Sequence, residues 1–458
     1  MSFFRLFVSY CCLIAFQTIL FTPTVQAGLK AGAAKKSIVP PFPTQMGGFF
    51  DRDKNFEGVH DEVFARAVVI DNGKTKLVFV GSDLMSLDNA LVPLTREAVT
   101  QATGIPGTNI LLCATHNHSA PSFYQKTQAG KDDEEPSLKR FLVQQFTDAV
   151  IEADRALVPA RIGFGAGSLV GATRNRQQKN DLIDPQVGVL RMEELESRKT
   201  IATLFNFTGH PVIVGSTNLM LSGEYPGAAS RAVENLLSGV AVFTQGACGD
   251  ITVNRNGDPF LEIERLGRTV AGEVIKTSGL IKLEDDLALK AASISLTLPT
   301  RQWPTLEQAK LDLERGQAAL AQAQQQSAPA TLIGQIEDKN RVFKMAVTRA
   351  ESLVKDPGKQ ESELKSEVQV LQVGNVIYAA IPGELFVEYA LELRSRVKQD
   401  TGNSFCLVGY ANGYVGYIVT PRAVETGGYE ASITRLPPLG GRILTEAAMD
   451  LVHKLQGN

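Results

Sequence analysis

The sequence is poor in the residues that carry most metal and disulfide chemistry. Its 458 residues include five histidines, five cysteines and one tryptophan. No CxxC pair is present, so a thiolate zinc knuckle is not expected. The three cysteines beyond residue 27, Cys113, Cys248 and Cys406, allow one disulfide at most. A formal net charge of −3 provides no basic surface for nucleic acid, and no GxSxG elbow supplies a serine nucleophile.

The first 27 residues differ from the rest of the chain. They carry one charged residue, Arg5, followed by an apolar run at 7–21 and a small-residue site at 25–27. This pattern is typical of a cleaved secretory signal peptide. A membrane anchor is the alternative, but the apolar run is near the short limit for a span of about 20 residues. We therefore expect an exported chain, secreted or periplasmic, whose mature part is residues 28–458.

Strand and helix patterns alternate along most of the mature chain. A tight turn at 71–74, which contains an Asn-Gly dipeptide, joins expected strands at 63–70 and 76–80. Helices are expected at 87–102, 137–157 and 443–455, and further strands at 110–114, 161–164, 187–191, 201–207, 240–244, 367–373, 376–381 and 405–409. Short apolar strands interleaved with helices predict an α/β (α+β) domain with mixed sheets layered with helices.

One segment, at about 304–356, breaks this alternation. Thr305 and Gln308 form a capping-box pattern that opens a run of heptad-spaced small and apolar residues. A Ser-Ala-Pro sequence at 327–329 interrupts the run, and a second helical pattern follows it. We expect a helical hairpin inserted into the main domain, serving as a packing arm or lid. Its Gln/Ala-rich surface argues against deep membrane insertion.

Two of the five histidines, His116 and His118, come directly after the apolar strand at 110–114. Side chains two positions apart on an extended backbone project to the same face, so both rings can reach one pocket. Strand ends that face a crevice are common ligand sites. The pair taken alone is equally compatible with metal binding, proton transfer or two satisfied core histidines.

Two other strands end in similar side chains. His210 follows the strand at 201–207, and Glu384 follows the strand at 376–381 after a Pro-Gly turn. Each has a simpler explanation, His210 as a core histidine and Glu384 as a carboxylate at a helix N-terminus. Together with the first strand, however, they supply His, His and Glu, which suits a zinc ion with an open position for water.

Several motifs, taken in order, resemble the catalytic domain of the neutral ceramidases, which are secreted zinc amidases that cleave the N-acyl bond of ceramide. The main motifs are THNHSAP (115–121), GHPV (209–212), IPGELF (381–386), YVGYIVT (414–420) and GYEAS (428–432). Supporting motifs are QMGGFFDR (45–52), VHDEVFARAVVI (59–70), ATRNRQ (172–177) and GACGDITVN (246–254). The resemblance spans nearly all of residues 29–456 apart from the hairpin.

The resemblance implies roles for individual residues. One zinc ion per chain would be held by His116, His210, Glu384 and Tyr417, the tyrosine being assigned by the resemblance alone. The remaining roles implied are a proton donor or orienter for His118, contact with the substrate oxygen for Arg176, and a second active-site tyrosine for Tyr429. A zinc-activated hydroxide would attack the amide carbonyl, and a proton must then reach the leaving nitrogen.

Three features depart from the family pattern. The family motif Gly-Asp-x-Ser-Pro-Asn, with its catalytically important serine, reads Gly-Asp-Ile-Thr-Val-Asn at 249–254, so Thr252 replaces the serine. Ala120 stands where the family has glycine. The C-terminal β-sandwich domain of the family is also not expected in this chain.

These observations favour an exported zinc amidohydrolase that converts ceramide to sphingosine and fatty acid. The expected partners are a lipid or N-acyl amide substrate and a peripheral membrane contact, without nucleic acid. One alternative is a zinc hydrolase of another N-acyl amide or an ester. The other is a non-catalytic, metal-stabilised binding protein, against which the retention of His118 and Arg176 argues, because a structural zinc site needs neither.

Overall fold

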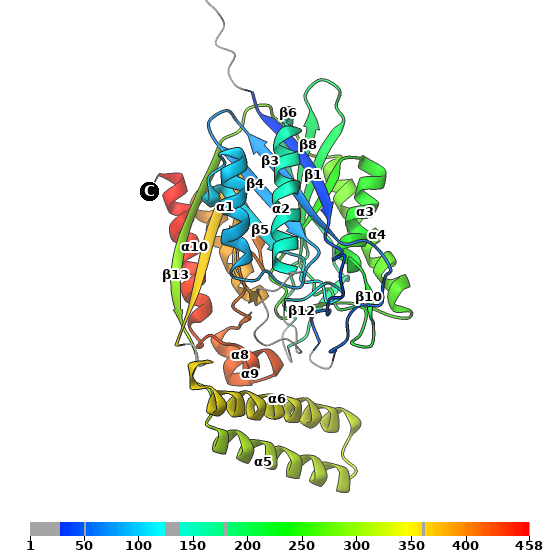
Figure 1. Ribbon diagram of the computed structural model, residues 1–458, viewed down its shortest axis with the longest axis vertical. Coiled ribbons are helices and arrows are strands. Elements are labelled where there is room, and N and C mark those ends of the chain that lie inside the picture. The colour runs from blue at the N-terminus through cyan, green and yellow to red at the C-terminus, as the bar shows by residue number, and fades with distance from the viewer. Residues whose placement is uncertain (1–27, 50–51, 124–137, 178–180, 360–361, 458) are drawn as a thin grey trace, which may run out of the picture.

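Two mixed β-sheets packed face to face form the framework of the protein (Figure 1). The structure is a computed structural model that describes residues 28–49, 52–123, 138–177, 181–359 and 362–457. The larger sheet contains, in spatial order, β11 (Val240–Gln245), β9 (Thr200–Phe207), β8 (Gln186–Glu194), β6 (Val158–Ser168), β1 (Lys30–Ser37), β3 (Phe64–Asp71), β4 (Lys76–Ser82) and β5 (Ile110–Ala114). The smaller sheet contains β13 (Leu289–Pro299), β14 (Glu363–Val373), β15 (Val376–Ala380) and β17 (Ser404–Val408).

The period-two alternation of strand side chains builds the interior. In β3, Val68 and Ile70 enter the core between the two sheets, whereas Val69 faces the helices outside. In β14, Leu371 enters the same central core, whereas Val370 faces the opposite helices. Because both faces are covered there, apolar residues occupy consecutive positions at 67–70 of β3 and along β15.

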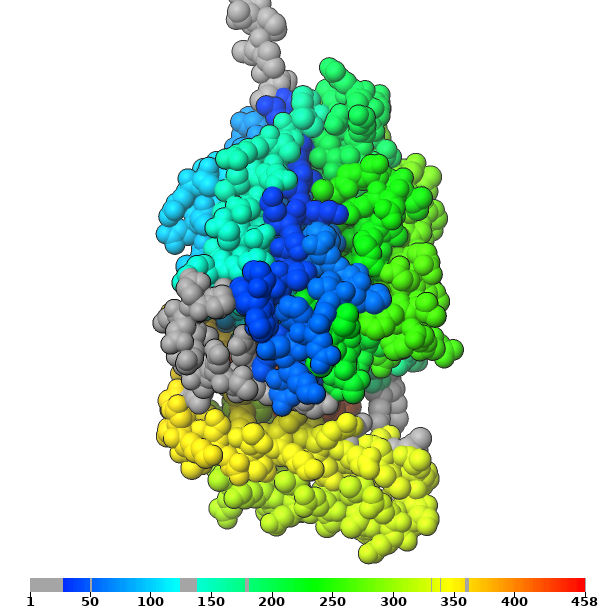
Figure 2. Space-filling model, turned by 45° about the vertical axis from the view of Figure 1, so that its right-hand side comes forward, coloured from blue at the N-terminus to red at the C-terminus, as the bar shows by residue number. Residues whose placement is uncertain are grey.

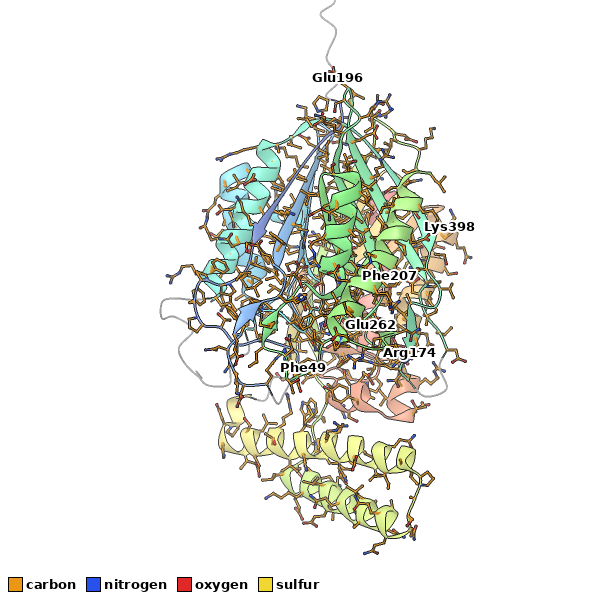
Figure 3. The ribbon with its side chains drawn as sticks, turned by 90° about the vertical axis from the view of Figure 1, so that its right-hand side faces the viewer. Phe49, Arg174, Glu196, Phe207, Glu262 and Lys398 are labelled. Carbon is orange, nitrogen blue, oxygen red and sulfur yellow. The ribbon has the colours of Figure 1, made fainter. Side chains whose placement is uncertain are left out.

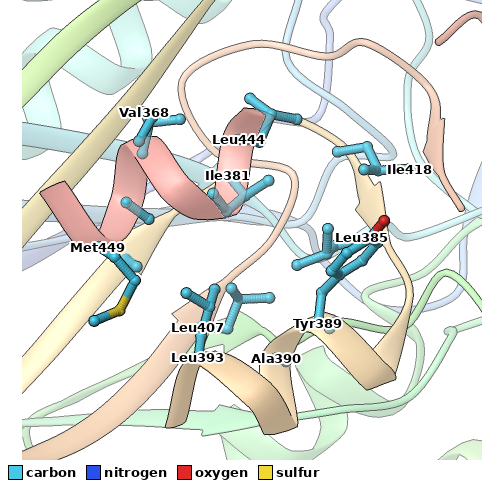
Figure 4. Close-up of a cluster of buried hydrophobic side chains, with 14 of the residues drawn as sticks. Val368, Ile381, Leu385, Tyr389, Ala390, Leu393, Leu407, Ile418, Leu444 and Met449 are labelled. Atoms are coloured by element: carbon cyan, nitrogen blue, oxygen red, sulfur yellow. The ribbon is translucent and has the colours of Figure 1, made fainter. Parts of the chain in front are cut away.

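Helices cover both outer faces and complete four layers. The larger sheet is covered by α1 (Leu91–Thr103), α2 (Leu138–Arg155), α3 (Glu224–Leu237) and α4 (Pro259–Ser278). The smaller sheet is covered by α7 (Val387–Thr401) and α10 (Gly440–Gln456). In the core beneath these last two helices, Leu444 and Met449 of α10 lie close to Val368 and Leu407 of the sheet (Figure 4).

Helices α5 (Leu306–Gln325) and α6 (Ala330–Lys355) lie between β13 and β14 in the chain and pack against each other. They form a layer across one end of the molecule (Figure 2). Thr305 caps α5 by accepting a hydrogen bond from the Gln308 backbone, at 3.2 Å. The Gln308 side chain bonds to Asp312 instead of returning to the cap, so only half of the expected capping box forms.

The remaining elements are short. They are β2 (Gly58–Val59), β7 (Thr173–Asn175), β10 (Met220–Leu221), β12 (Ile251–Val253), β16 (Glu384–Leu385), β18 (Tyr417–Ile418), α8 (Pro421–Thr426) and α9 (Tyr429–Ile433), with 3₁₀ turns at Gly107–Asn109 and Pro357–Lys359. Within the described part of the chain, no helix combines the length and apolar character needed to cross a membrane.

The α/β fold class expected from the sequence is confirmed, and each strand expected from its pattern is present within a few residues of its expected bounds. The helices expected at 137–157 and 443–455 correspond to α2 and α10, and the run at about 304–356 contains α5 and α6. Strands β1 and β13 and helices α3 and α4 were missed. The expected signal peptide lies outside the described residues, and the division into domains stays a prediction.

Candidate metal and catalytic site

The larger sheet curls so that its two edges approach each other. Strand β11, at one edge, contacts β3, β4 and β5 at the other edge. At the crossing, a Cβ on Gly81 would overlap the carbonyl oxygen of Phe243, so the close approach requires glycine there. The curl brings together the chain segments that follow β5 and β9, which are far apart in the flat order of the sheet.

Gln245, the last residue of β11, joins these two segments. Its fully buried Nε2 donates to the carbonyl oxygens of Thr115 and Gly209, each at 2.9 Å. These carbonyls belong to the residues immediately before His116 and His210. A single amide therefore fixes the backbone from which both histidines project.

His116 and His118 converge through a turn of the backbone. Strand β5 ends at Ala114, and His116 has a φ of +66°, a left-handed conformation that non-glycine residues seldom adopt. The two Nε2 atoms lie 3.2 Å apart. The extended backbone expected from the sequence is therefore wrong at His116, although the expected meeting of the two rings occurs.

His210 completes a cluster of three imidazoles. Its Nε2 lies 2.9 Å from that of His116 and 3.3 Å from that of His118. Each of the three residues is less than 10% exposed. On their other ring nitrogens, His116 Nδ1 lies 2.8 Å from the Met85 carbonyl oxygen and His210 Nδ1 lies 3.3 Å from that of Cys248. These contacts direct both Nε2 atoms at the same point.

Glu384 and Tyr417 approach the cluster from segments that follow the smaller sheet. They are direct register partners in the two-residue parallel ladder between β16 and β18. Glu384 Oε2 lies 3.3 Å from His116 Nε2, and Tyr414 donates a hydrogen bond to the other carboxylate oxygen, Oε1. The site is thus assembled at the meeting of the two sheets.

The spacing of these atoms suits a metal ion. With metal–nitrogen distances of 2.0–2.1 Å, ligands at the corners of a tetrahedron lie about 3.3 Å apart. The three Nε2 atoms are separated by 2.9, 3.2 and 3.3 Å. A buried carboxylate adjoins them, so the donor set is that of a nitrogen- and oxygen-ligated divalent metal.

The charge state of the side chains fits the same interpretation. Burial, together with the neighbouring His116 and Arg176, lowers the pKa of His118 and of His210 well below the usual value, which favours the neutral form that binds metals. Burial acts to raise the pKa of Glu384, but His116 and the hydrogen bond from Tyr414 outweigh it and lower the pKa. Burial and Glu384 raise the pKa of Tyr417, against the influence of Arg176.

Arg176 and Tyr429 lie beside Tyr417. Arg176 Nη2 donates to the Tyr417 hydroxyl at 3.0 Å and to the Gly249 carbonyl at 2.6 Å. Tyr429 packs edge to face on Tyr417, with ring centroids 6.1 Å apart, and is 41% exposed. The structure therefore brings both predicted residues to the site, while their catalytic roles stay predictions.

Thr252 is placed next to the cluster through its backbone. It lies in β12 and forms a bridge with His210. Within the described residues, no hydrogen bond connects its hydroxyl to the imidazoles. A direct role of this hydroxyl in place of the family's serine stays a prediction.

Sequence reasoning missed four residues that shape the site. Tyr410 stacks on His116 with centroids 4.1 Å apart, Tyr414 holds Glu384, Gln245 holds the two histidine segments, and Glu430 pairs with Arg176. Tyr414 and Glu430 fall inside the quoted motifs, so their position beside Tyr417 and Tyr429 was the available signal. Phe49 packs on His118. Figure 3 shows Phe49 toward the end of the molecule that carries the hairpin, whereas Glu196 lies at the other end.

Fold and site together define a layered α/β protein with a candidate metal site where its two sheets meet. Residues 30–263 match the family model described as neutral/alkaline non-lysosomal ceramidase, N-terminal. This range contains the three clustered histidines, Arg176 and Thr252, but not Glu384, Tyr417 or Tyr429.

Curated relatives and solved structures support the same family. A neutral ceramidase from Pseudomonas aeruginosa is 23% identical over 86% of this chain and 67% of its own length. One from Mycobacterium tuberculosis is 23% identical over 90% and 74%, respectively. The crystal structure of the Pseudomonas aeruginosa neutral ceramidase superposes with a TM-score of 0.72 at 20% identity, covering 93% of this chain and 75% of that one.

The chain belongs to the neutral/alkaline non-lysosomal ceramidase family. The family predicted from the sequence is thus confirmed, and so is the assignment of the chain as a hydrolase. The three buried histidines could hold a metal ion.

Proposed function

We propose that this chain is an exported, zinc-dependent amidohydrolase that splits ceramide into sphingosine and a fatty acid. The observation that carries the proposal is the convergence of three imidazole Nε2 atoms within 3.3 Å of one another, with Glu384 alongside. The curated relatives are named neutral ceramidases. His116, His210, Glu384 and Tyr417 would hold the zinc ion, which supplies Lewis acidity and an activated water at neutral pH.

The residues around this centre have complementary tasks. The Arg176 guanidinium, already directed at the Tyr417 hydroxyl, provides positive charge for an oxyanion that forms from the amide carbonyl. Tyr429 is partly exposed to solvent, so it can contact the substrate. His116, His210 and Glu384 are buried, and burial strengthens these electrostatic interactions.

His118 is suited to moving a proton. Its lowered pKa keeps the resting ring neutral, so it can first accept a proton released from water. It can then deliver this proton to the amide nitrogen, which leaves poorly as an anion. The nearness of its Nε2 to the other two imidazoles also makes His118 a candidate third nitrogen ligand, and the two roles are separable by experiment.

The test is release of labelled fatty acid from ceramide by the purified chain, before and after treatment with a chelator and again after zinc is restored. Activity that is lost with the chelator and regained with zinc would support both the reaction and the metal. A folded, zinc-loaded sample that leaves ceramide intact would overturn ceramide as the substrate.

A second candidate function is that of a zinc hydrolase that cleaves another N-acyl amide or an ester. Thr252 at the position of the family's serine favours a modified acyl pocket or leaving group. The same assay, run on a panel of N-acyl amides and esters, distinguishes this candidate from a ceramidase.

Export and contact with a lipid surface complete the proposal. The pattern of residues 1–27 supports a signal peptide, and mass spectrometry of the exported chain should find it beginning at Gly28. A lipid substrate calls for peripheral membrane contact, which sedimentation with ceramide-containing vesicles would detect. A chain that stays in the cytoplasm with residues 1–27 intact would contradict export.

A further inference from the structure

Glu430 is a buried carboxylate beside the proposed catalytic arginine. It is 4% exposed and lies in α9, directly after Tyr429. Its Oε1 lies 2.7 Å from Arg176 Nε, and its Oε2 accepts a hydrogen bond from Gln177 Nε2 at 2.6 Å. The two carboxylate oxygens therefore contact two consecutive residues, Arg176 and Gln177, which directly follow β7.

The position of Arg176 is determined by three partners in different parts of the chain. Glu430 Oε1 forms an ion pair with Nε at 2.7 Å without the geometry of a hydrogen bond, while Nη2 donates to the Gly249 carbonyl and the Tyr417 hydroxyl. Without Glu430, the hydrogen bonds of the guanidinium to other described residues would be those of Nη2 with two neutral acceptors, and the guanidinium could rotate about its Nε end. The Glu430 carboxylate attracts the Nε end of the guanidinium while hydrogen bonds hold Nη2, so the buried ion pair opposes this rotation.

Helix α9, which carries Glu430, is itself anchored on its other side. Arg301 Nη1, near the base of the hairpin, donates to the Ala431 carbonyl at 2.8 Å. The same guanidinium lies 4.9 Å from the centroid of the Trp303 ring, which Arg349 of α6 approaches to 4.2 Å. A helix of one turn has little stability of its own, so these contacts hold Glu430 in place.

We propose that Glu430 is a positioning residue that sets the orientation of the Arg176 guanidinium toward Tyr417 and the substrate oxygen. The inference deepens the proposed function and rests on it for its kinetic consequences. An effect of this kind falls mainly on kcat, because a misdirected guanidinium loses its interaction with charge that develops only in the transition state.

A buried ion pair can also contribute only to the stability of the fold. A second ion pair of similar burial, away from the site, provides a control for that explanation. Asp184 pairs with Arg394 at 2.6 Å, with side-chain exposures of 4% and 22%. The corresponding values for Glu430 and Arg176 are 5% and 25%. Asp184→Asn therefore removes a carboxylate of the same burial from a pair with no member in the site.

The test compares Glu430→Gln, Asp184→Asn, Arg176→Ala and the double variant Arg176→Ala/Glu430→Gln in the full, zinc-loaded chain. Glu430→Gln should lower kcat at least tenfold with KM within twofold, whereas Asp184→Asn should keep kcat within twofold. In the Arg176→Ala background, Glu430→Gln should change kcat less than twofold. An unchanged kcat in Glu430→Gln, or the same loss in both backgrounds, would overturn the proposal.

Crystal structures of the two single variants give a readout that does not depend on activity. The hydrogen bond between Arg176 Nη2 and Tyr417 should be lost in Glu430→Gln and kept in Asp184→Asn. Retention of that bond in Glu430→Gln would contradict the positioning role. If the wild-type chain hydrolyses none of the amides or esters tested, the proposed function fails, and these structures still decide the role of Glu430.

Discussion

Glu384 and Tyr417 are direct register partners in a parallel ladder only two residues long. Each follows a different strand of the smaller sheet, and their pairing places a carboxylate and a phenol side by side next to three imidazoles. Glu384 is 3% exposed and Tyr417 8% exposed, so both polar groups are buried at the site. Tyr414 donates to Glu384 and Arg176 donates to Tyr417, and a shared metal ion would be a further partner for both oxygen groups.

The roles of His116 and His118 can be separated by metal content. His116→Ala removes a proposed ligand and should leave less than about a tenth of the wild-type zinc after dialysis. His118→Ala should keep its zinc while kcat falls by about 10²–10⁴, the usual contribution of a proton-transfer residue. Elemental analysis and steady-state kinetics measure the two effects. Loss of zinc in His118→Ala would identify this residue as a third nitrogen ligand.

His453→Ala is the matched control for these two variants. His453 is exposed on α10 and its Nε2 lies 2.9 Å from Asp400, with no contact to the site. Its replacement should leave both zinc content and kcat at wild-type values.

Tyr414 is expected to support metal binding through Glu384. Its hydroxyl donates to Glu384 Oε1, so Tyr414→Phe should leave the carboxylate less well oriented. Residues that orient ligands typically contribute about 10–100-fold to metal affinity. Competition with a chromophoric chelator measures the change. Tyr378→Phe, a buried tyrosine in the central core, is the control. Equal zinc affinity in both variants would show that Tyr414 does not orient the carboxylate.

Gly48 leaves room for the His118 ring. Its φ is +97°, and a Cβ added there would overlap Nδ1 and Cγ of the imidazole. Gly48→Ala should therefore displace His118 and lower kcat at least tenfold. Gly104→Ala carries a similar backbone cost, because Gly104 has a φ of +74°, but its Cβ would meet open space. The control should lose about 1 kcal/mol of stability and no activity. Full activity in Gly48→Ala would contradict a fixed position for His118.

Glu224 should make stability depend on pH. Burial raises the pKa of this fully buried carboxyl to about 8, and its Oε2 has no hydrogen-bond partner among the described residues. The folded state therefore keeps the proton up to about pH 8, whereas the unfolded chain releases it near pH 4.5. The contribution of Glu224 to stability is full below pH 4.5 and falls as the pH rises from 4.5 to 8.

Glu224→Gln removes this dependence. The variant should match the wild-type Tm at pH 4.5 and exceed it at pH 9, since each unit of pKa shift corresponds to about 1.4 kcal/mol. Thermal unfolding at several pH values measures the difference, with the exposed Glu284→Gln as a control. A constant Tm difference across this range would refute the assignment.

Local patterns predicted most elements of this fold. Apolar runs such as Val376–Ala380 and the turn between β3 and β4 are decided by neighbouring residues, so their bounds were predicted within a few positions. Strand β13 was missed because its exposed positions dilute the apolar pattern. Helix α3 was missed because a Pro-Gly pair, which disfavours helix formation, stands near its start. Its first residue, Glu224, also has a left-handed φ of +52°.

The sequence by itself determined that His116, His210 and Glu384 follow buried strands, because strand periodicity and chain order are local properties. The tertiary structure alone decided that these ends meet. β5 and β9 approach only because the larger sheet curls, and Glu384 joins them only because the second sheet packs against the first. The partnerships of Tyr414 with Glu384 and of Glu430 with Arg176 follow from the same packing. Tyr414 and Glu384 are 30 positions apart in the sequence, and Glu430 is more than 250 positions from the segment that contains Arg176. No local sequence pattern encodes contacts over such separations.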